Sequence, residues 1–128
     1  MAEIVLDHVQ VAMPAGAEDD ARRFFGDLLG LREIPKPAPQ SGRGGCWFQL
    51  GDKQLHLGVE PDFRPAGKAH IAVAVDDLRA VRTRLEAAGY AIREDSPLEG
   101  RQRFFTTDPF GNRMEFVEAV AATMGATV

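Results

Sequence analysis

The chain has 128 residues, of which 45% are hydrophobic and 27% are charged, and its formal net charge is −4. This length suits one globular domain, and the scattered basic residues lack the positive excess that nucleic-acid binding requires. No apolar run is long enough to span a membrane, and the first residues lack the pattern of a signal peptide, so we expect a cytoplasmic protein.

Two stretches of the sequence repeat one pattern. "HVQVAM" (8–13) and "HIAVAV" (70–75) each begin with a histidine and alternate like a β-strand. A helical pattern follows each of them, at about 19–29 and again in "DDLRAVRTRLEAAG" (76–89). The chain is therefore expected to contain a duplicated strand–helix unit.

The ends of the two helices carry recognisable signals. Gly30 and Gly89 follow the last apolar positions of the helical patterns, as glycines that end helices do. Asp76 or Asp77 is suited to cap the start of the second helix.

Further strands are expected after each helix, separated by turn residues at "GDK" and "DPFGN". They are "CWFQL" (46–50), "QLHLGV" (54–59), "YAIRE" (90–94), "RFFTT" (103–107) and "RMEFVEA" (113–119). The sequence thus predicts a βαβββ module twice within one domain, 1–128, with module 1 at about 3–60 and module 2 at about 68–119.

Three segments break this order. Prolines and glycines at 35–45 predict a mobile loop, and a second break at 60–68 joins the two modules. The tail 121–128 has no pattern that would hold it in place, so we expect it to fray.

Side chains alternate between the two faces of a strand, and the polar positions fall in rows opposite the helices. These rows contain His8, Gln10 and Ala12; Gln54, His56 and Gly58; His70, Ala72 and Ala74; and Arg113, Glu115 and Val117. All three histidines of the chain and Glu115 therefore occupy the same kind of face.

Duplicated modules packed side by side would bring His8, His56, His70 and Glu115 together about a pseudo-twofold axis. Imidazole nitrogens and a carboxylate are the ligands that Zn²⁺, Ni²⁺, Mn²⁺ or Fe²⁺ uses. We therefore expect a divalent transition metal, with the turn at 108–112 setting the register of Glu115. The alternative is a metal-free pocket in which these residues only hydrogen-bond to one another.

The sequence resembles the vicinal oxygen chelate superfamily of glyoxalases, bleomycin resistance proteins and extradiol dioxygenases. The resemblance is carried by "LDHVQVAM", "FFGDLLGL", "AHIAVAVDDL" and "DPFGNRMEFVE", in this order along nearly the whole chain. It implies an α+β fold in which two βαβββ modules form a cup-shaped mixed β-sheet with helices on the outer face. It also implies metal ligands at His8, His56, His70 and Glu115.

Two departures bear on the activity. Glyoxalase I usually has a glutamate at the position of His56, so three histidines and one glutamate leave a divalent site with about one positive charge. The extradiol dioxygenases use two histidines and a carboxylate, matched by His8, His70 and Glu115, which would make His56 an extra ligand or an acid-base group.

The resemblance implies a metal-dependent enzyme that acts on a small oxygenated metabolite by Lewis-acid chemistry, first as a lyase or isomerase and second as a dioxygenase. His56 or Glu115 would then be the catalytic base. The alternative is a non-catalytic protein that binds a small molecule or sequesters an antibiotic. We expect a homodimer. The two modules that form one cup come either from a single chain or from the two chains of the dimer.

Five residues are candidates to contact the substrate: Gln10, Trp47, Gln54, Arg103 and Arg113. Each also has a structural interpretation, because polar residues can fill a solvated sheet face, Trp47 can belong to the core, and Arg103 can form a surface salt bridge. Asp7 is expected to point away from His8, and Cys46 to be a buried small side chain rather than a nucleophile.

Overall fold

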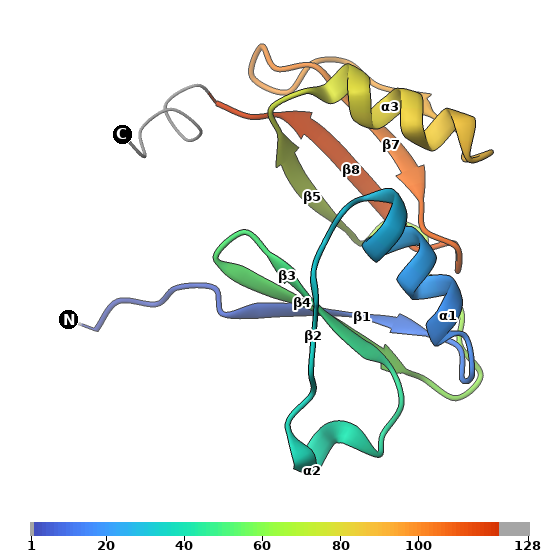
Figure 1. The fold of residues 1–128 in the computed structure, drawn as a ribbon. Coiled ribbons are helices and arrows are strands. Elements are labelled where there is room, and N and C mark those ends of the chain that lie inside the picture. The colour runs from blue at the N-terminus through green and yellow to red at the C-terminus, as the bar shows by residue number, and fades with distance from the viewer. Residues whose placement is uncertain (1, 121–128) are drawn as a thin grey trace. The chain divides into compact units, whose positions relative to one another are not determined.

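The computed structural model describes residues 2–120, and the chain divides into two compact units, Met1–Pro65 and Ala66–Val128 (Figure 1). Each unit has its own four-stranded mixed sheet. The tail predicted to fray, 121–128, lies outside the described residues.

Unit 1 has a sheet with the strand order β1-β4-β3-β2. β1 runs parallel to β4, and the other neighbours are antiparallel. Its elements are β1 (His8–Met13), α1 (Glu18–Ala21), η1 (Arg22–Leu28), β2 (Glu33–Ile34), α2 (Ala38–Ser41), β3 (Cys46–Leu50) and β4 (Lys53–Val59).

Unit 2 repeats this topology with the order β5-β8-β7-β6, and again only the first pair is parallel. Its elements are β5 (His70–Val75), α3 (Leu78–Ala87), β6 (Arg93–Glu94), β7 (Arg103–Thr107) and β8 (Arg113–Glu118). The two mixed sheets confirm the predicted α+β fold of two βαβββ modules.

The helices begin and end close to the predicted residues. The first is not a regular α-helix throughout, because α1 continues directly into the π-helix η1. Asp77, rather than Asp76, caps α3 by accepting a hydrogen bond from the Ala80 N–H at 3.0 Å. Gly30 and Gly89 follow the helices with φ of 78° and 90°, a conformation that favours glycine.

Two expectations need correction. The segment "YAIRE" was predicted as a five-residue strand, but only Arg93 and Glu94 pair with β7. The segment 35–45 was predicted as a loop, but it contains the short helix α2, which begins after Pro37. The Gly45 N–H at the end of this segment donates to Glu18 Oε2 at 2.8 Å, which ties the segment to α1.

Most of the buried apolar side chains come from the helices and from the strand rows that were predicted to face them. In unit 1 they include Met13, Phe24, Phe25, Phe48, Leu55 and Leu57, and in unit 2 Val81, Leu85, Phe104, Met114 and Phe116. Phe25 lies 5.7 Å from Phe48 and Phe104 lies 5.3 Å from Phe116 between ring centroids, so aromatic pairs contribute to both cores. The opposite face of each sheet carries the polar rows that contain the candidate site residues.

Candidate metal and substrate site

The polar row of unit 1 forms as the alternation predicts. In the β1–β4 register His8 pairs with Gln54 and Gln10 pairs with His56, and Trp47 of β3 pairs with His56 from the other side. Because paired residues project from the same face of a sheet, these five side chains share one surface.

His56 lies in an aromatic stack. Its ring centroid is 3.7 Å from that of Trp47, with planes 3° apart, and 4.3 Å from that of His8, with planes 21° apart. His56 is only 5% exposed, and its burial, with a smaller contribution from His8, lowers its pKa below the ordinary value. Its neutral form is therefore favoured at neutral pH.

Gln54 holds one nitrogen of the His56 ring. Gln54 Oε1 accepts a hydrogen bond at 2.8 Å from His56 Nε2, so this nitrogen carries the proton and Nδ1 carries the lone pair. For Nε2 to bind a metal, Gln54 would have to release it. This arrangement suits His56 as a proton acceptor better than as a ligand through Nε2.

His8 has a different environment. Asp7 Oδ2 lies 2.9 Å from His8 Nδ1, which corrects the expectation that Asp7 points away. This hydrogen bond is the main cause of a lowered pKa of Asp7. A carboxylate that holds one nitrogen of a histidine leaves the lone pair on the other, the arrangement typical of histidines that bind metals.

Gln10 lies against the backbone of β4. A Cβ added to Gly58, which pairs with Ala12, would lie 2.7 Å from Gln10 Nε2. The absence of a side chain at Gly58 thus provides the space that the Gln10 amide fills.

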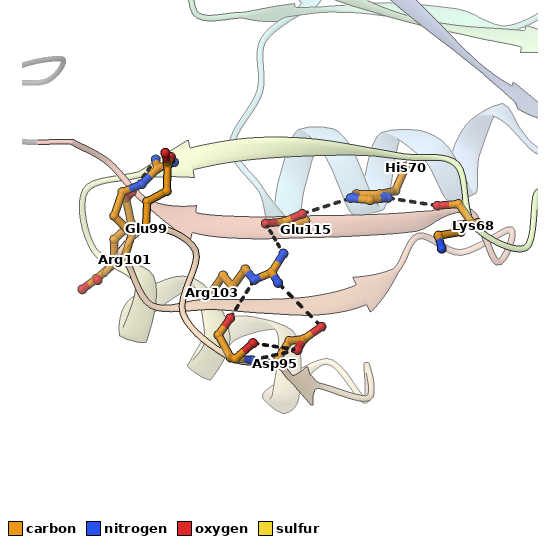
Figure 2. A network of polar contacts seen from close by, with 9 residues as sticks. Lys68, His70, Asp95, Glu99, Arg101, Arg103 and Glu115 are labelled. Atoms are coloured by element: carbon orange, nitrogen blue, oxygen red, sulfur yellow. Dashed lines mark hydrogen bonds and ion pairs between the residues drawn. The ribbon is translucent and has the colours of Figure 1, made fainter.

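In unit 2, His70 faces a hydrogen-bond acceptor at each ring nitrogen (Figure 2). Nδ1 lies 3.0 Å from the Lys68 carbonyl oxygen, and Nε2 lies 3.0 Å from Glu115 Oε1. A neutral imidazole has one proton and can satisfy only one of them. One ring nitrogen therefore faces an acceptor oxygen without a proton of its own to donate, a position that a bound cation could occupy.

The chemistry of this pair fits a divalent metal. An imidazole nitrogen and a carboxylate oxygen are donor types that such a metal uses, and His70 Nε2 and Glu115 Oε1 already lie 3.0 Å apart, within hydrogen-bond distance. Among the described residues, the structure contains no group of three or more His, Cys, Asp or Glu side chains that could hold a metal ion. Each unit provides part of the predicted set, His8 and His56 in one and His70 and Glu115 in the other.

Arg103 supports Glu115 from the other side (Figure 2). A terminal guanidinium nitrogen donates to Glu115 Oε2 at 3.1 Å, and Nε donates to the Ser96 carbonyl oxygen at 2.9 Å. Asp95 Oδ2 lies 3.8 Å from the second terminal nitrogen. Arg103, predicted to contact an anionic substrate, is thus already engaged by protein groups.

Glu115 is 3% exposed, and the turn before it fixes its register. Asp108 Oδ1 accepts hydrogen bonds from the N–H groups of Phe110 and Asn112, at 2.9 and 2.8 Å, and Oδ2 accepts one from the Asn112 amide at 2.9 Å. Asp108 is itself buried, and burial raises its pKa despite these hydrogen bonds. The acidic residue at the start of "DPFGN" therefore organises the turn that precedes β8.

Phe105 was not predicted as a site residue, although it alternates with Phe104 and shares the face of Arg103. It pairs with Glu115 across the sheet, and its ring meets the His70 ring edge-on at 5.2 Å. The guanidinium carbon of Arg113 lies 4.4 Å from its centroid. Arg113, predicted to contact substrate, therefore stacks on a residue beside the His70–Glu115 pair.

Cys46 is buried, and burial raises the pKa of its thiol to about 11. The thiolate is therefore scarce at neutral pH, which supports its interpretation as a core side chain.

Comparison with known families decides the classification. The family model of the Glyoxalase/Bleomycin resistance protein/Dioxygenase superfamily matches residues 5–116. The chain belongs to this superfamily. Its members generally depend on a metal. A comparison with curated proteins found no match.

Solved structures agree with this assignment. A glyoxalase family protein from Bacillus anthracis is 43% identical, with a TM-score of 0.87, over 94% of this chain and 100% of that chain. Two more distant structures share the fold, each over 93% of this chain and 96% of its own length. They are a lactoylglutathione lyase from Agrobacterium tumefaciens (21% identity, TM-score 0.71) and a fosfomycin resistance protein from Listeria monocytogenes (13%, 0.74). No helix among the described residues is long and apolar enough to cross a membrane.

Proposed function

We propose that this glyoxalase-superfamily chain is a metal-dependent lyase or isomerase that acts on a small oxygenated metabolite. The observation that carries the proposal is the His70–Glu115 pair, in which Nε2 and a carboxylate oxygen lie 3.0 Å apart while the Lys68 carbonyl occupies the other ring nitrogen. A pair held in this way is suited to a cation.

The proposed ligands are His8, His70 and Glu115, with His56 as a fourth ligand or as the base. A divalent metal bound by them would supply Lewis-acid polarisation of a substrate carbonyl or hydroxyl. Asp7 holds Nδ1 of His8 and so presents Nε2 of that ring, while Arg103 fixes the second oxygen of Glu115.

His56 is the proposed proton acceptor. Its lowered pKa keeps the ring neutral near pH 7, and the hydrogen bond to Gln54 leaves Nδ1 with a lone pair. The stack between Trp47 and His8 fixes the plane of the ring. The step proposed for it is removal of a proton from a carbon next to a substrate carbonyl, with the proton taken up by Nδ1. Gln10 and Arg113 remain candidates to orient the substrate.

A non-catalytic binding protein is the second candidate. It is favoured by the packed Trp47–His56–His8 stack, which offers an aromatic surface without any metal. The two proposals differ in what Glu115 does, because a binding protein needs it only for structure. We also propose that the chain works as a cytoplasmic homodimer.

Hydrogen exchange in D₂O tests the enzyme proposal. The metal-loaded protein is incubated with small α-hydroxy carbonyl compounds, and NMR follows deuterium incorporation next to the carbonyl. The proposal predicts exchange that is lost in Glu115→Gln and His56→Gln and retained in Glu118→Gln, a control on the same strand. Binding without exchange for every compound favours the binding protein, and oxygen uptake by the iron-loaded form favours a dioxygenase.

A further inference from the structure

Three guanidinium groups surround the Phe105 ring on the polar face of the unit 2 sheet. The guanidinium carbons of Arg113, Arg93 and Arg103 lie 4.4, 4.8 and 5.3 Å from the ring centroid. Each distance is within the range of a cation–π interaction. Arg93 and Glu115 pair with Phe105 from the two neighbouring strands, so the cluster adjoins the His70–Glu115 pair.

The three arginines differ in the protein groups that their guanidinium N–H groups contact. Arg103 binds Glu115, Ser96 and Asp95. Among the described residues, Arg93 and Arg113 make neither a side-chain hydrogen bond nor an ion pair with a protein group, and both guanidinium groups lie over the Phe105 ring. The pKa of Asp95 is lowered mainly by its hydrogen bond from the Ser96 N–H, with smaller contributions from the charges of Arg103 and Arg93. The N–H groups of Arg93 and Arg113 are therefore available to a ligand.

The charge of this face favours an anion. Three guanidinium groups are accompanied by two carboxylates, Glu115 and Asp95, and both carboxylates already interact with Arg103. Stacking on an aromatic ring orients a guanidinium and leaves its N–H edge free for the two parallel hydrogen bonds that carboxylates and phosphoryl groups accept.

We propose that Arg93 and Arg113 bind an oxyanion of the substrate, a carboxylate or a phosphoryl group, with Phe105 as the platform that positions them. The substrate is then an acid whose charged group lies beside the part of the molecule that His70 and Glu115 contact. The identification of this anion as part of a substrate rests on the proposed function. The prediction that Arg93 and Arg113 bind an oxyanion does not rest on it.

Calorimetric titration with acetate and with methylphosphonate, at constant ionic strength set by chloride, tests the proposal on the full chain. We expect saturable binding of at least one probe. The double variant Arg93→Gln/Arg113→Gln is expected to weaken it about tenfold or more, since each lost charge-assisted hydrogen bond is worth about that factor. Arg79→Gln/Arg84→Gln, which removes two charges from exposed positions on α3, should change it less than about twofold.

The two probes separate the sources of the anion. Preference for acetate assigns a carboxylate, and preference for methylphosphonate assigns a phosphoryl group. Arg93→Lys/Arg113→Lys should recover only part of the affinity, because lysine keeps the charge without the planar fork. No saturable binding by the parent, or equal losses in the two glutamine double variants, would overturn the proposal. Metal content measured on the same samples reports separately on the proposed function.

Discussion

His70 Nε2 and Glu115 Oε1 lie 3.0 Å apart on neighbouring parallel strands, and each partner is held by a further group behind it. The Lys68 carbonyl fixes the other nitrogen of the ring, and Arg103 fixes the other oxygen of the carboxylate. Protein groups on both sides therefore preorganise the pair.

Removing the carboxylate is predicted to destabilise the fold. Glu115→Ala leaves the guanidinium of Arg103 without its main partner in a largely buried position, so the free energy of unfolding should fall by about 2–4 kcal/mol. Urea denaturation measures it. Glu94→Gln, which alters an exposed ion pair with Arg82, is the control and should cost less than about 1 kcal/mol. Equal losses in both variants would contradict this account of Glu115.

The stack around His56 predicts a pH dependence. Because burial lowers the pKa of folded His56, the unfolded chain binds the proton more readily, and stability should fall as the pH drops below about 6.5. NMR titration of the ring resonances measures this pKa directly. Trp47→Ala exposes the ring and should raise the pKa toward its ordinary value. A His56 that titrates normally in the parent would show that burial does not govern the ring.

Asp7 is predicted to tune metal binding without supporting the fold. Asp7→Asn weakens the hydrogen bond that orients His8, and the loss of such outer contacts typically reduces metal affinity about 10–100-fold. Competition with a chelating dye measures the affinity. Asp52→Asn, at an exposed aspartate in the turn before β4, is the matched control. Parent-like metal affinity in Asp7→Asn would remove Asp7 from the site.

Two glycines with positive φ should respond differently to alanine. Gly45 has φ of 83°, and an added Cβ would lie 2.0 Å from the Leu57 carbonyl oxygen, so the backbone must move and the cost should exceed about 3 kcal/mol. Gly51 has φ of 59° and open space, so Gly51→Ala should cost only about 1–2 kcal/mol. Thermal unfolding compares them. Similar melting temperatures would show that the backbone around Gly45, just before β3, adjusts easily.

The fold could be predicted because its main signals are periodic. Alternation in 8–13 and 70–75 and helical spacing in 76–89 place the major elements and the polar rows. The two-residue strand β2 escapes this approach, and β6 was predicted three residues too long, since two residues are too few to show alternation. The change to a π-helix in η1 likewise leaves no clear signature in the spacing of Phe24, Phe25 and Leu28.

The candidate site was predictable as a set of positions but not as a set of contacts. Period-2 alternation places His56 and Glu115 on polar rows, yet it cannot tell whether Gln54 or Arg103 bonds to them, because this depends on side-chain rotamers. The Asp7–His8 contact joins sequence neighbours that a strand would direct to opposite faces, and Asp7 lies just before β1 begins. That is why it was missed.

Metal content is the most direct test of the central claim. Protein purified without an affinity tag or chelator is analysed by inductively coupled plasma mass spectrometry, together with His8→Ala/Glu115→Ala and Glu118→Gln. The account predicts about one transition metal per chain in the parent and in Glu118→Gln, and none in the double variant. A parent that stays free of zinc, nickel, manganese and iron after reconstitution would contradict the metal-dependent enzyme and favour the binding protein.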